Sequence, residues 1–227
     1  MSAALPPNPP LKNASSTAIT LQIVSIVIYT FIAFLCIGLP IAVMPGYVHN
    51  QLGFSAVVAG LVIGSQYLAT LFSRPVAGRI CDTIGTKRAI VYGLLGIVVS
   101  GVLTAAAVLL EPFTDVSLVI LIIARLILGG SQGLIGVGTI SWCIGQLGAE
   151  HTARSISWNG IASYGAIAIG APLGVVMVEG LGFVSLGLVL MILAGGALLM
   201  IRNKAPVPVV RGERMAFWSV FGRVAPY

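Results

Sequence analysis

The sequence contains few charged residues. Only 8% of its 227 residues are Asp, Glu, Lys or Arg, whereas 58% are hydrophobic and the mean hydropathy is +1.06. A soluble domain carries about 25% charged residues, so this chain lacks the polar groups that would cover a water-facing surface. Intrinsic disorder requires low hydrophobicity and high charge, which also excludes that class. The composition predicts an integral membrane protein.

Cysteines and catalytic motifs are equally scarce. The three cysteines are an odd number and indicate no disulfide framework. The hydrophobic segments hold no HExxH sequence, no paired catalytic aspartates and no Ser/His arrangement. We therefore expect neither an enzyme nor a metal site, and no cofactor. No Asp or Glu lies at mid-depth in any hydrophobic segment, so this part of the protein lacks an obvious proton-carrying carboxylate.

Six hydrophobic segments are long enough to cross a bilayer, which requires about 20 mostly apolar residues. They are Thr20–Met44, Ser55–Leu71, Ala89–Leu110, Val116–Ile140, Trp158–Val178 and Leu181–Ile201. The last two are joined by a short gap at Glu179-Gly180, and together they are too long for one crossing. The sequence therefore predicts an all-α integral membrane protein with six transmembrane helices.

The chain divides into four predicted segments. Residues 1–18, with two Pro-Pro pairs and a Ser/Thr run, are typical of a flexible cytoplasmic tail. Residues 19–201 form the six-helix transmembrane domain, and residues 202–216 form a basic cytoplasmic linker. Residues 217–227 are predicted to be either an interfacial helix or the start of a truncated seventh span.

Basic residues gather on one side of this domain. All twelve Lys and Arg residues except Arg125 lie before span one, between spans two and three or four and five, or after span six. Loops 45–54, 111–115 and 179–180 contain none. By the positive-inside rule both termini are cytoplasmic. The basic pI of 9.6 then reflects topology and attraction to anionic membrane lipids, and predicts no nucleic-acid partner.

Arg125 is the sharpest candidate for function, because it lies inside span four. A charge near the bilayer centre costs about 2.5–3.5 kcal/mol on insertion scales, so Arg125 should face the bundle interior. Gly129, Gln132 and Gly136 follow it at helical spacing on the same face, which suits a cavity wall. Arg125 would bind an anionic or polar substrate group, or exchange partners during proton coupling. The alternative is a structural Arg bonded to carbonyls of a neighbouring helix.

Other polar side chains within the spans complete the candidate substrate site. The predicted substrate-binding residues are Tyr29, Gln66, Tyr67, Arg125, Gln132 and Tyr164. Small residues predict close helix packing, in span two at Gly60 and Gly64 and in span five at Gly170 and Gly174. Trp142 is interpreted as an anchor at the membrane interface.

The segment between spans two and three resembles a known motif. Gly78, Asp82, Gly85, Lys87 and Arg88 match G-x-x-x-D-x-x-G-x-[RK]-[RK], motif A of the major facilitator superfamily, with departures at the variable positions Cys81 and Thr83. The resemblance implies that these residues form a cytoplasmic latch against the other half of a transporter, one that favours the outward-open state. From the residues alone, Asp82 is also placed to accept hydrogen bonds from helix-terminal N–H groups, and a plain positive-inside loop is the alternative.

Two further segments are similar to motifs of this family. Arg125 and Gly129 match the R-x-x-x-G of motif B. The helix-packing set Gly165, Gly170, Pro172 and Gly174 is similar to motif C of efflux antiporters, although Ala171 stands where a Gly usually precedes the Pro. The local sequence most resembles the bacterial YhhS/YfcJ-type, arabinose-efflux-like permeases. The resemblance covers residues 19–222 and only the amino-terminal half of a family member.

The resemblance implies a fold of two inverted three-helix repeats and a function in transport. The expected activity is secondary active export of small organic molecules such as sugars or drugs by alternating access, driven by the proton gradient across the bacterial inner membrane. Expected partners are membrane lipids, a small-molecule substrate, and either a missing C-terminal six-helix half or a second copy. An uptake symporter on the same fold, or a non-transporting membrane fragment that acts as an interaction module, are the alternatives. Substrate, direction, coupling ion and the natural length of the chain stay open.

Overall fold

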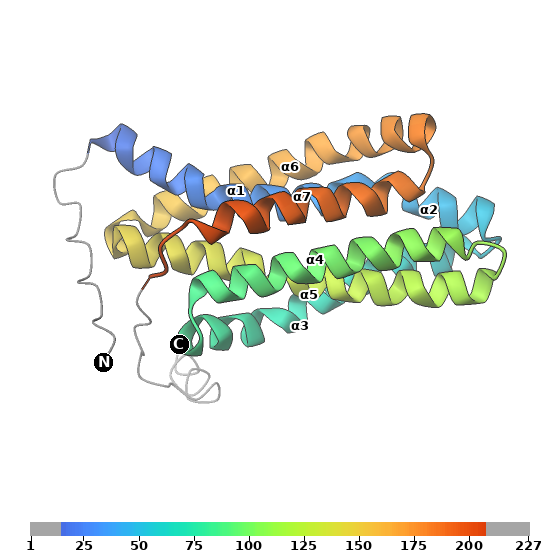
Figure 1. Cartoon of the computed structure of the whole chain (residues 1–227), viewed down its shortest axis with the longest axis horizontal. Coiled ribbons are helices and arrows are strands. Elements are labelled where there is room, and N and C mark those ends of the chain that lie inside the picture. Colours follow the sequence, from blue (N-terminus) through green and yellow to red (C-terminus); the bar gives the residue numbers. More distant parts are fainter. Residues whose placement is uncertain (1–14, 208–227) are drawn as a thin grey trace, which may run out of the picture.

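The computed structural model describes residues 15–207, and over this range the chain is entirely helical and contains no strand. Six of the helices are long, and they lie side by side along the longest axis of the molecule (Figure 1). They are α1 (Ser16–Ile41), α3 (Ala56–Thr83), α4 (Thr86–Leu109), α5 (Thr114–Leu147), α6 (Thr152–Leu181) and α7 (Val184–Arg202). The short α2 (Met44–Gly46) and a π-helical turn (Tyr47–Gln51) extend α1, and a 3-10 turn (Ala149–His151) precedes α6.

All six long helices have the length and hydropathy needed to cross a membrane, which confirms the predicted fold class. Five of them are longer than the predicted spans, most clearly α3, whereas α7 is shorter because Leu181 belongs to α6. The hydrophobic segment ends at Leu71, but α3 continues to Thr83 and only Ile84 and Gly85 separate it from α4. Hydropathy marks only the apolar part of a helix, and α3 ends in polar turns. The expected loop between spans two and three is therefore mostly helix.

The helix ends follow local sequence signals. Ser15 caps α1 by accepting a hydrogen bond from Ala18 N at 3.3 Å, so the helix begins within the predicted tail. Ser55 caps α3 in the same way. Gly85 has a φ of 106°, a conformation that glycine adopts without strain. The predictions for residues 1–14 and for 208–227, which include the interfacial helix or seventh span, lie outside the described residues.

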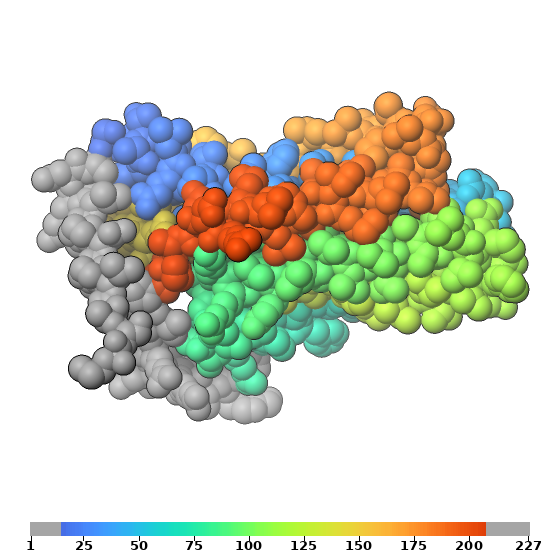
Figure 2. Space-filling view, viewed as in Figure 1, coloured from blue at the N-terminus to red at the C-terminus, as the bar shows by residue number. Residues whose placement is uncertain are grey.

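The pattern of helix pairs is that of two inverted repeats. Helix α1 packs along α6, and α5 packs along α3. If α1, α3 and α4 form one repeat and α5, α6 and α7 the other, these two pairs are equivalent. The large contact of α4 with α7 is equivalent to itself, whereas that of α4 with α5 has only a small counterpart, α1 with α7. Figure 2 shows α7 filling the face between α4 on one side and α1 and α6 on the other.

Glycines bring the backbones of these equivalent pairs together. A Cβ on Gly129 of α5 would overlap the Gln66 carbonyl of α3. A Cβ on Gly174 of α6 would overlap the Leu39 carbonyl of α1, and one on Gly170 would lie 3.0 Å from Gly38 Cα. Backbone contact of this kind is how small residues stabilise helix pairs in membranes.

Other glycines for which we expect packing have open surroundings instead. A Cβ added to Gly60 or Gly64 of α3, or to Gly165 of α6, would meet no neighbouring atom within 4 Å among residues 15–207. These glycines lie on the two long helices whose hydrophobic segments are least buried in the bundle. Within this part of the chain, they therefore contact no other helix closely.

Charged side chains separate to the two ends of the bundle. Lys87, Arg154 and Lys204 lie at the end where α1 begins and α7 ends, while Glu111 and Glu179 lie at the opposite end. Lys87 Nζ donates hydrogen bonds to the carbonyls of Arg202 and Lys204 at the end of α7, where a cation is favoured by the helix dipole. Lys204 Nζ in turn donates to Ser25 Oγ of α1 at 3.2 Å. The predicted cytoplasmic end is thus held together by lysines.

The contact between α3 and α5 can be tested with neighbouring glycines. We expect Gly129→Ala to destabilise the bundle by about 1–3 kcal/mol, because the new methyl group overlaps the Gln66 carbonyl. Gly130→Ala is the control, since a Cβ there meets no atom within 4 Å and Ala is the better helix former. Thermal unfolding in nanodiscs measures both, and equal midpoints for the two variants would contradict the observed packing.

Candidate functional site

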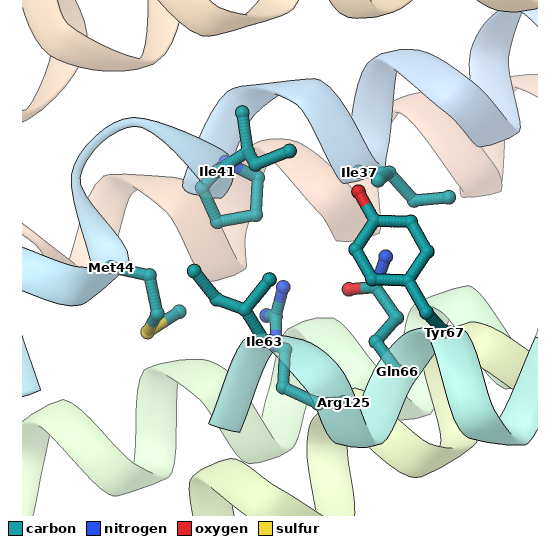
Figure 3. A pocket seen from close by; sticks show the side chains of 8 residues that line it. Ile37, Ile41, Met44, Ile63, Gln66, Tyr67 and Arg125 are labelled. Atoms are coloured by element: carbon teal, nitrogen blue, oxygen red, sulfur yellow. The ribbon is translucent and has the colours of Figure 1, made fainter. Parts of the chain in front are cut away.

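A narrow pocket lies where α1, α3 and α5 meet. Its walls are formed by Ile37, Pro40, Ile41, Met44, Ile63, Gln66, Tyr67 and Arg125. Figure 3 shows Gln66 and Tyr67 reaching from α3 toward α1, with the Arg125 guanidinium between the helices. The space that the centre of a water molecule can reach is about 10 Å³, room for about one water. The pocket therefore joins three polar side chains from two helices inside an apolar wall.

Arg125 is buried in the bundle, with 2% of its surface exposed. Its Nη2 donates a 3.0 Å hydrogen bond to Thr104 Oγ1 of α4, and its Nε has no hydrogen-bond partner among the described residues. The observed partner is thus a side-chain hydroxyl. The alternative of a purely structural Arg125 predicted hydrogen bonds to backbone carbonyls of a neighbouring helix instead. A guanidinium has five N–H donors, and the bond to Thr104 is the one hydrogen bond that it makes within residues 15–207.

Gln66 and Tyr67 are neighbours in α3 that lie at the edge of the pocket. Gln66 is buried, whereas 45% of the Tyr67 surface is exposed, so Tyr67 marks the open side. Gln132, one turn further along α5 than Gly129, does not line the pocket. Its Oε1 accepts a 3.1 Å hydrogen bond from Thr70 Oγ1, which joins α5 to α3 instead.

The other two predicted substrate-binding residues lie elsewhere. Tyr29 is fully buried and stacks on Trp142, with ring centroids 6.2 Å apart and planes inclined by 4°. Trp142 is accordingly an interior residue, contrary to its interpretation as an interface anchor. Tyr164 lies on the outer face of α6 with 77% of its surface exposed. Helical spacing assigns a residue to a face, but it does not say which helix covers that face.

A second polar cluster joins α1, α5 and α6, and sequence reasoning missed it. Thr30 Oγ1 lies 2.7 Å from Thr139 Oγ1 and donates to Asn159 Oδ1 at 2.8 Å. Two buried polar atoms nearby, Tyr29 Oη and Trp142 Nε1, have no partner within residues 15–207. Each of the three helices contributes one member, so no spacing within the sequence links them. The sequence signal that could have found the cluster is Asn159, a polar residue at the start of the fifth hydrophobic segment.

The residues of the motif A-like segment occupy the α3–α4 junction. Gly78 and Asp82 belong to the last turns of α3, Gly85 is the N-cap of α4, and Lys87 and Arg88 lie in its first turn. Asp82 is exposed, and at a helix C-terminus the free backbone groups are carbonyls. Free helix-terminal N–H groups therefore belong to the start of α4, and the predicted hydrogen bonds to Asp82 stay a prediction. Lys87, bonded to the end of α7, is the one member of this set whose side chain makes a hydrogen bond in the described residues.

The environment of Arg125 depends on Thr104. We expect Thr104→Val to destabilise the protein by about 1.5–3 kcal/mol, the usual cost of losing a hydrogen bond to a charged group. Thr83→Val is the matched control, because Thr83 and Thr104 each donate to a carbonyl four residues earlier but only Thr104 accepts from Arg125. Denaturant unfolding in detergent compares the two. A Thr104 variant as stable as the Thr83 variant would show that the bond to Arg125 contributes nothing.

Comparison with known proteins places the chain in a family. The family model described as Major Facilitator Superfamily matches residues 26–225. The chain is 51% identical over 213 residues to an uncharacterized MFS-type transporter of Burkholderia pseudomallei (strain 1106a), a match that covers 94% of this chain and 52% of the relative. It is 49% identical over 227 residues to an uncharacterized MFS-type transporter of Pseudomonas aeruginosa (strain LESB58), covering 100% of this chain and 56% of the relative.

The chain spans about half the length of the curated relatives it matches. Its six long apolar helices agree with the family assignment. Because the family model covers far more than half of its residues, the chain belongs to the major facilitator superfamily.

Proposed function

We propose that this chain is the amino-terminal half of a secondary active transporter that exports small organic molecules, such as sugars or drugs, by alternating access. The observation that carries the proposal is the pocket at Gln66, Tyr67 and Arg125, which places polar groups inside an otherwise apolar helix bundle. Intramembrane ionisable residues are rare and mark substrate or ion pathways. Substrate sites of such transporters lie near the midplane at the interface of structural repeats.

Export is proposed from the motif C-like segment of α6, and the arabinose-efflux-like subgroup from the local sequence at Gly38-Leu39-Pro40, Arg125–Gly129 and Ser157–Gly160. The bacterial inner membrane is proposed from the bacterial relatives. The driving force in this proposal is the proton gradient. Every Asp and Glu in the described helices lies near a helix end. In this proposal either the titrating group belongs to the second half, or Asp82 and Arg125 participate indirectly.

The transport proposal is tested with the chain co-expressed with the carboxyl-terminal half of the Pseudomonas relative. Everted membrane vesicles would be screened with labelled sugars and drugs for accumulation that a protonophore abolishes. Accumulation in everted vesicles supports export. Accumulation only in right-side-out vesicles would favour the uptake symporter, and no flux in either orientation would favour the interaction module.

Tyr67 gives this assay a residue-level prediction. We expect Tyr67→Phe to raise the KM for transport several-fold, because it removes the hydroxyl at the open side of the pocket. Tyr92→Phe is the control, since Tyr92 of α4 is equally exposed, at 46% against 45% for Tyr67, and does not line the pocket. An unchanged KM in the Tyr67 variant would remove it from the site.

The proposal also assigns a partner to the outer face of α3 and α6. This face combines exposed apolar side chains such as Leu68 and Ile161 with glycines that have no near neighbour among the described residues, Gly64 and Gly165 among them. Small residues let another helix approach closely. We assign the face to a second six-helix unit, either a C-terminal half or a second copy, with membrane lipids around both.

Association at this face can be measured by native mass spectrometry of nanodiscs. We expect Gly165→Leu to weaken binding of the co-expressed second half at least several-fold, because the side chain would separate the helices. Gly195→Leu on α7 is the control, as a Cβ there is equally unobstructed. If both variants retain the second unit equally, the contact face lies elsewhere.

A further inference from the structure

Arg125 is a buried cation without a neutralising partner in the described residues. Only 2% of its surface is exposed, a single hydrogen bond ties it to the neutral Thr104, and Nε has no partner there. Removing a charge from water is costly unless an opposite charge and hydrogen bonds compensate for it. An arginine held in this way favours any anion that can reach it.

The protein supplies no such anion between residues 15 and 207. Asp82 lies in the last turn of α3, Asp115 in the first turn of α5 and Glu179 near the end of α6. Glu111 and Glu150 lie in the connections between helices. Side chains at the helix ends are separated from Arg125 by several helical turns, each 5.4 Å long. The charge of Arg125 is therefore open to a ligand.

The pocket around Arg125 has the chemistry of an anion site. Arg125 shares it with the Gln66 carboxamide and the Tyr67 hydroxyl, both of which can donate hydrogen bonds. The other walls are apolar, which strengthens electrostatic attraction. Guanidinium groups bind planar carboxylates through two parallel hydrogen bonds. The free space is about that of one water molecule, so the side chains around it have to move to admit a carboxylate, and the rest of a ligand would extend past Tyr67.

We propose that the substrates are small organic anions, whose carboxylate or similar planar group binds Arg125 beside Gln66 and Tyr67. The inference that these anions are substrates rests on the proposed transport function. Anion binding itself can be tested without transport. A lone structural arginine would show no preference between an anion and a neutral molecule of the same shape. The proposal requires that preference.

The test uses acetate and acetamide, which have nearly the same size and planar shape but differ in charge. The chain is placed in nanodiscs of zwitterionic phosphatidylcholine, and ionic strength is kept constant with a bulky sulfonate buffer salt. We expect acetate to raise the unfolding temperature in a saturable way, as ligands that bind only the folded state do, and acetamide to have no such effect. Equal responses to acetate and acetamide would overturn the proposal.

Variants locate the binding at Arg125. Arg125→Gln should weaken acetate binding at least tenfold, and Arg125→Lys should bind with intermediate strength, since it keeps the charge without the bidentate geometry. Arg154→Gln is the control, because Arg154 is another helical arginine bonded to hydroxyl groups, those of Ser16 and Thr20. Circular dichroism checks folding, and Arg125→Lys carries the test if Arg125→Gln does not fold. Unchanged acetate binding in the Arg125 variants would overturn the proposal.

Repeating the titration with the carboxyl-terminal half co-expressed separates the two proposals. Retained acetate binding supports the anion site even if no flux is found, in which case the transport function alone fails. Loss of acetate binding in the assembled protein would show that a carboxylate of the second half neutralises Arg125, and would overturn the anion proposal while leaving transport intact. Transport of neutral substrates without acetate binding would likewise overturn the anion proposal and leave the transport function intact.

Discussion

Lipid tails are as apolar as leucine side chains, so membrane helices gain little by burying apolar surface against one another and depend on close packing and polar contacts. Here that packing is closest where Gly129 lies against the Gln66 carbonyl, and where Gly174 lies against the Leu39 carbonyl. These two contacts hold together the pairs α3–α5 and α1–α6, which are equivalent in the two repeats. They also build the pocket, since the residue whose backbone contacts Gly129 is the one whose side chain lies beside Arg125.

Charged side chains gather at the two ends of the bundle, and Arg125 is the buried exception among the described residues. At the predicted cytoplasmic end, Lys87 and Lys204 connect α4, the end of α7 and α1 through hydrogen bonds. These cations lie where the helix dipole and the interfacial water lower the cost of charge. Arg125 has neither advantage, and only Thr104 partly satisfies it. This contrast makes Arg125 the natural centre of a functional site.

Hydropathy predicted six spans, and the energetic cost of a buried charge predicted that Arg125 faces inward. Both arguments work because the bilayer imposes the same requirement on every part of a spanning helix. The ends of α3 were harder to predict, because its last turns are polar. Three of the six candidate substrate residues line one pocket, while Gln132, Tyr29 and Tyr164 do not. Each was chosen because it is polar, but polarity does not say which helix is the neighbour.

The sequence by itself determined the membrane class, the number of spans, the separation of charge and the family-like motifs, because these follow from composition and short spacings. Only the tertiary structure decided that Trp142 stacks on Tyr29, that Thr30, Thr139 and Asn159 meet, and that Lys87 holds the end of α7. The physical reason is that these contacts join helices far apart in the chain. The rotation and depth of each helix against its neighbours, which no local pattern encodes, determine which polar groups come within hydrogen-bond distance.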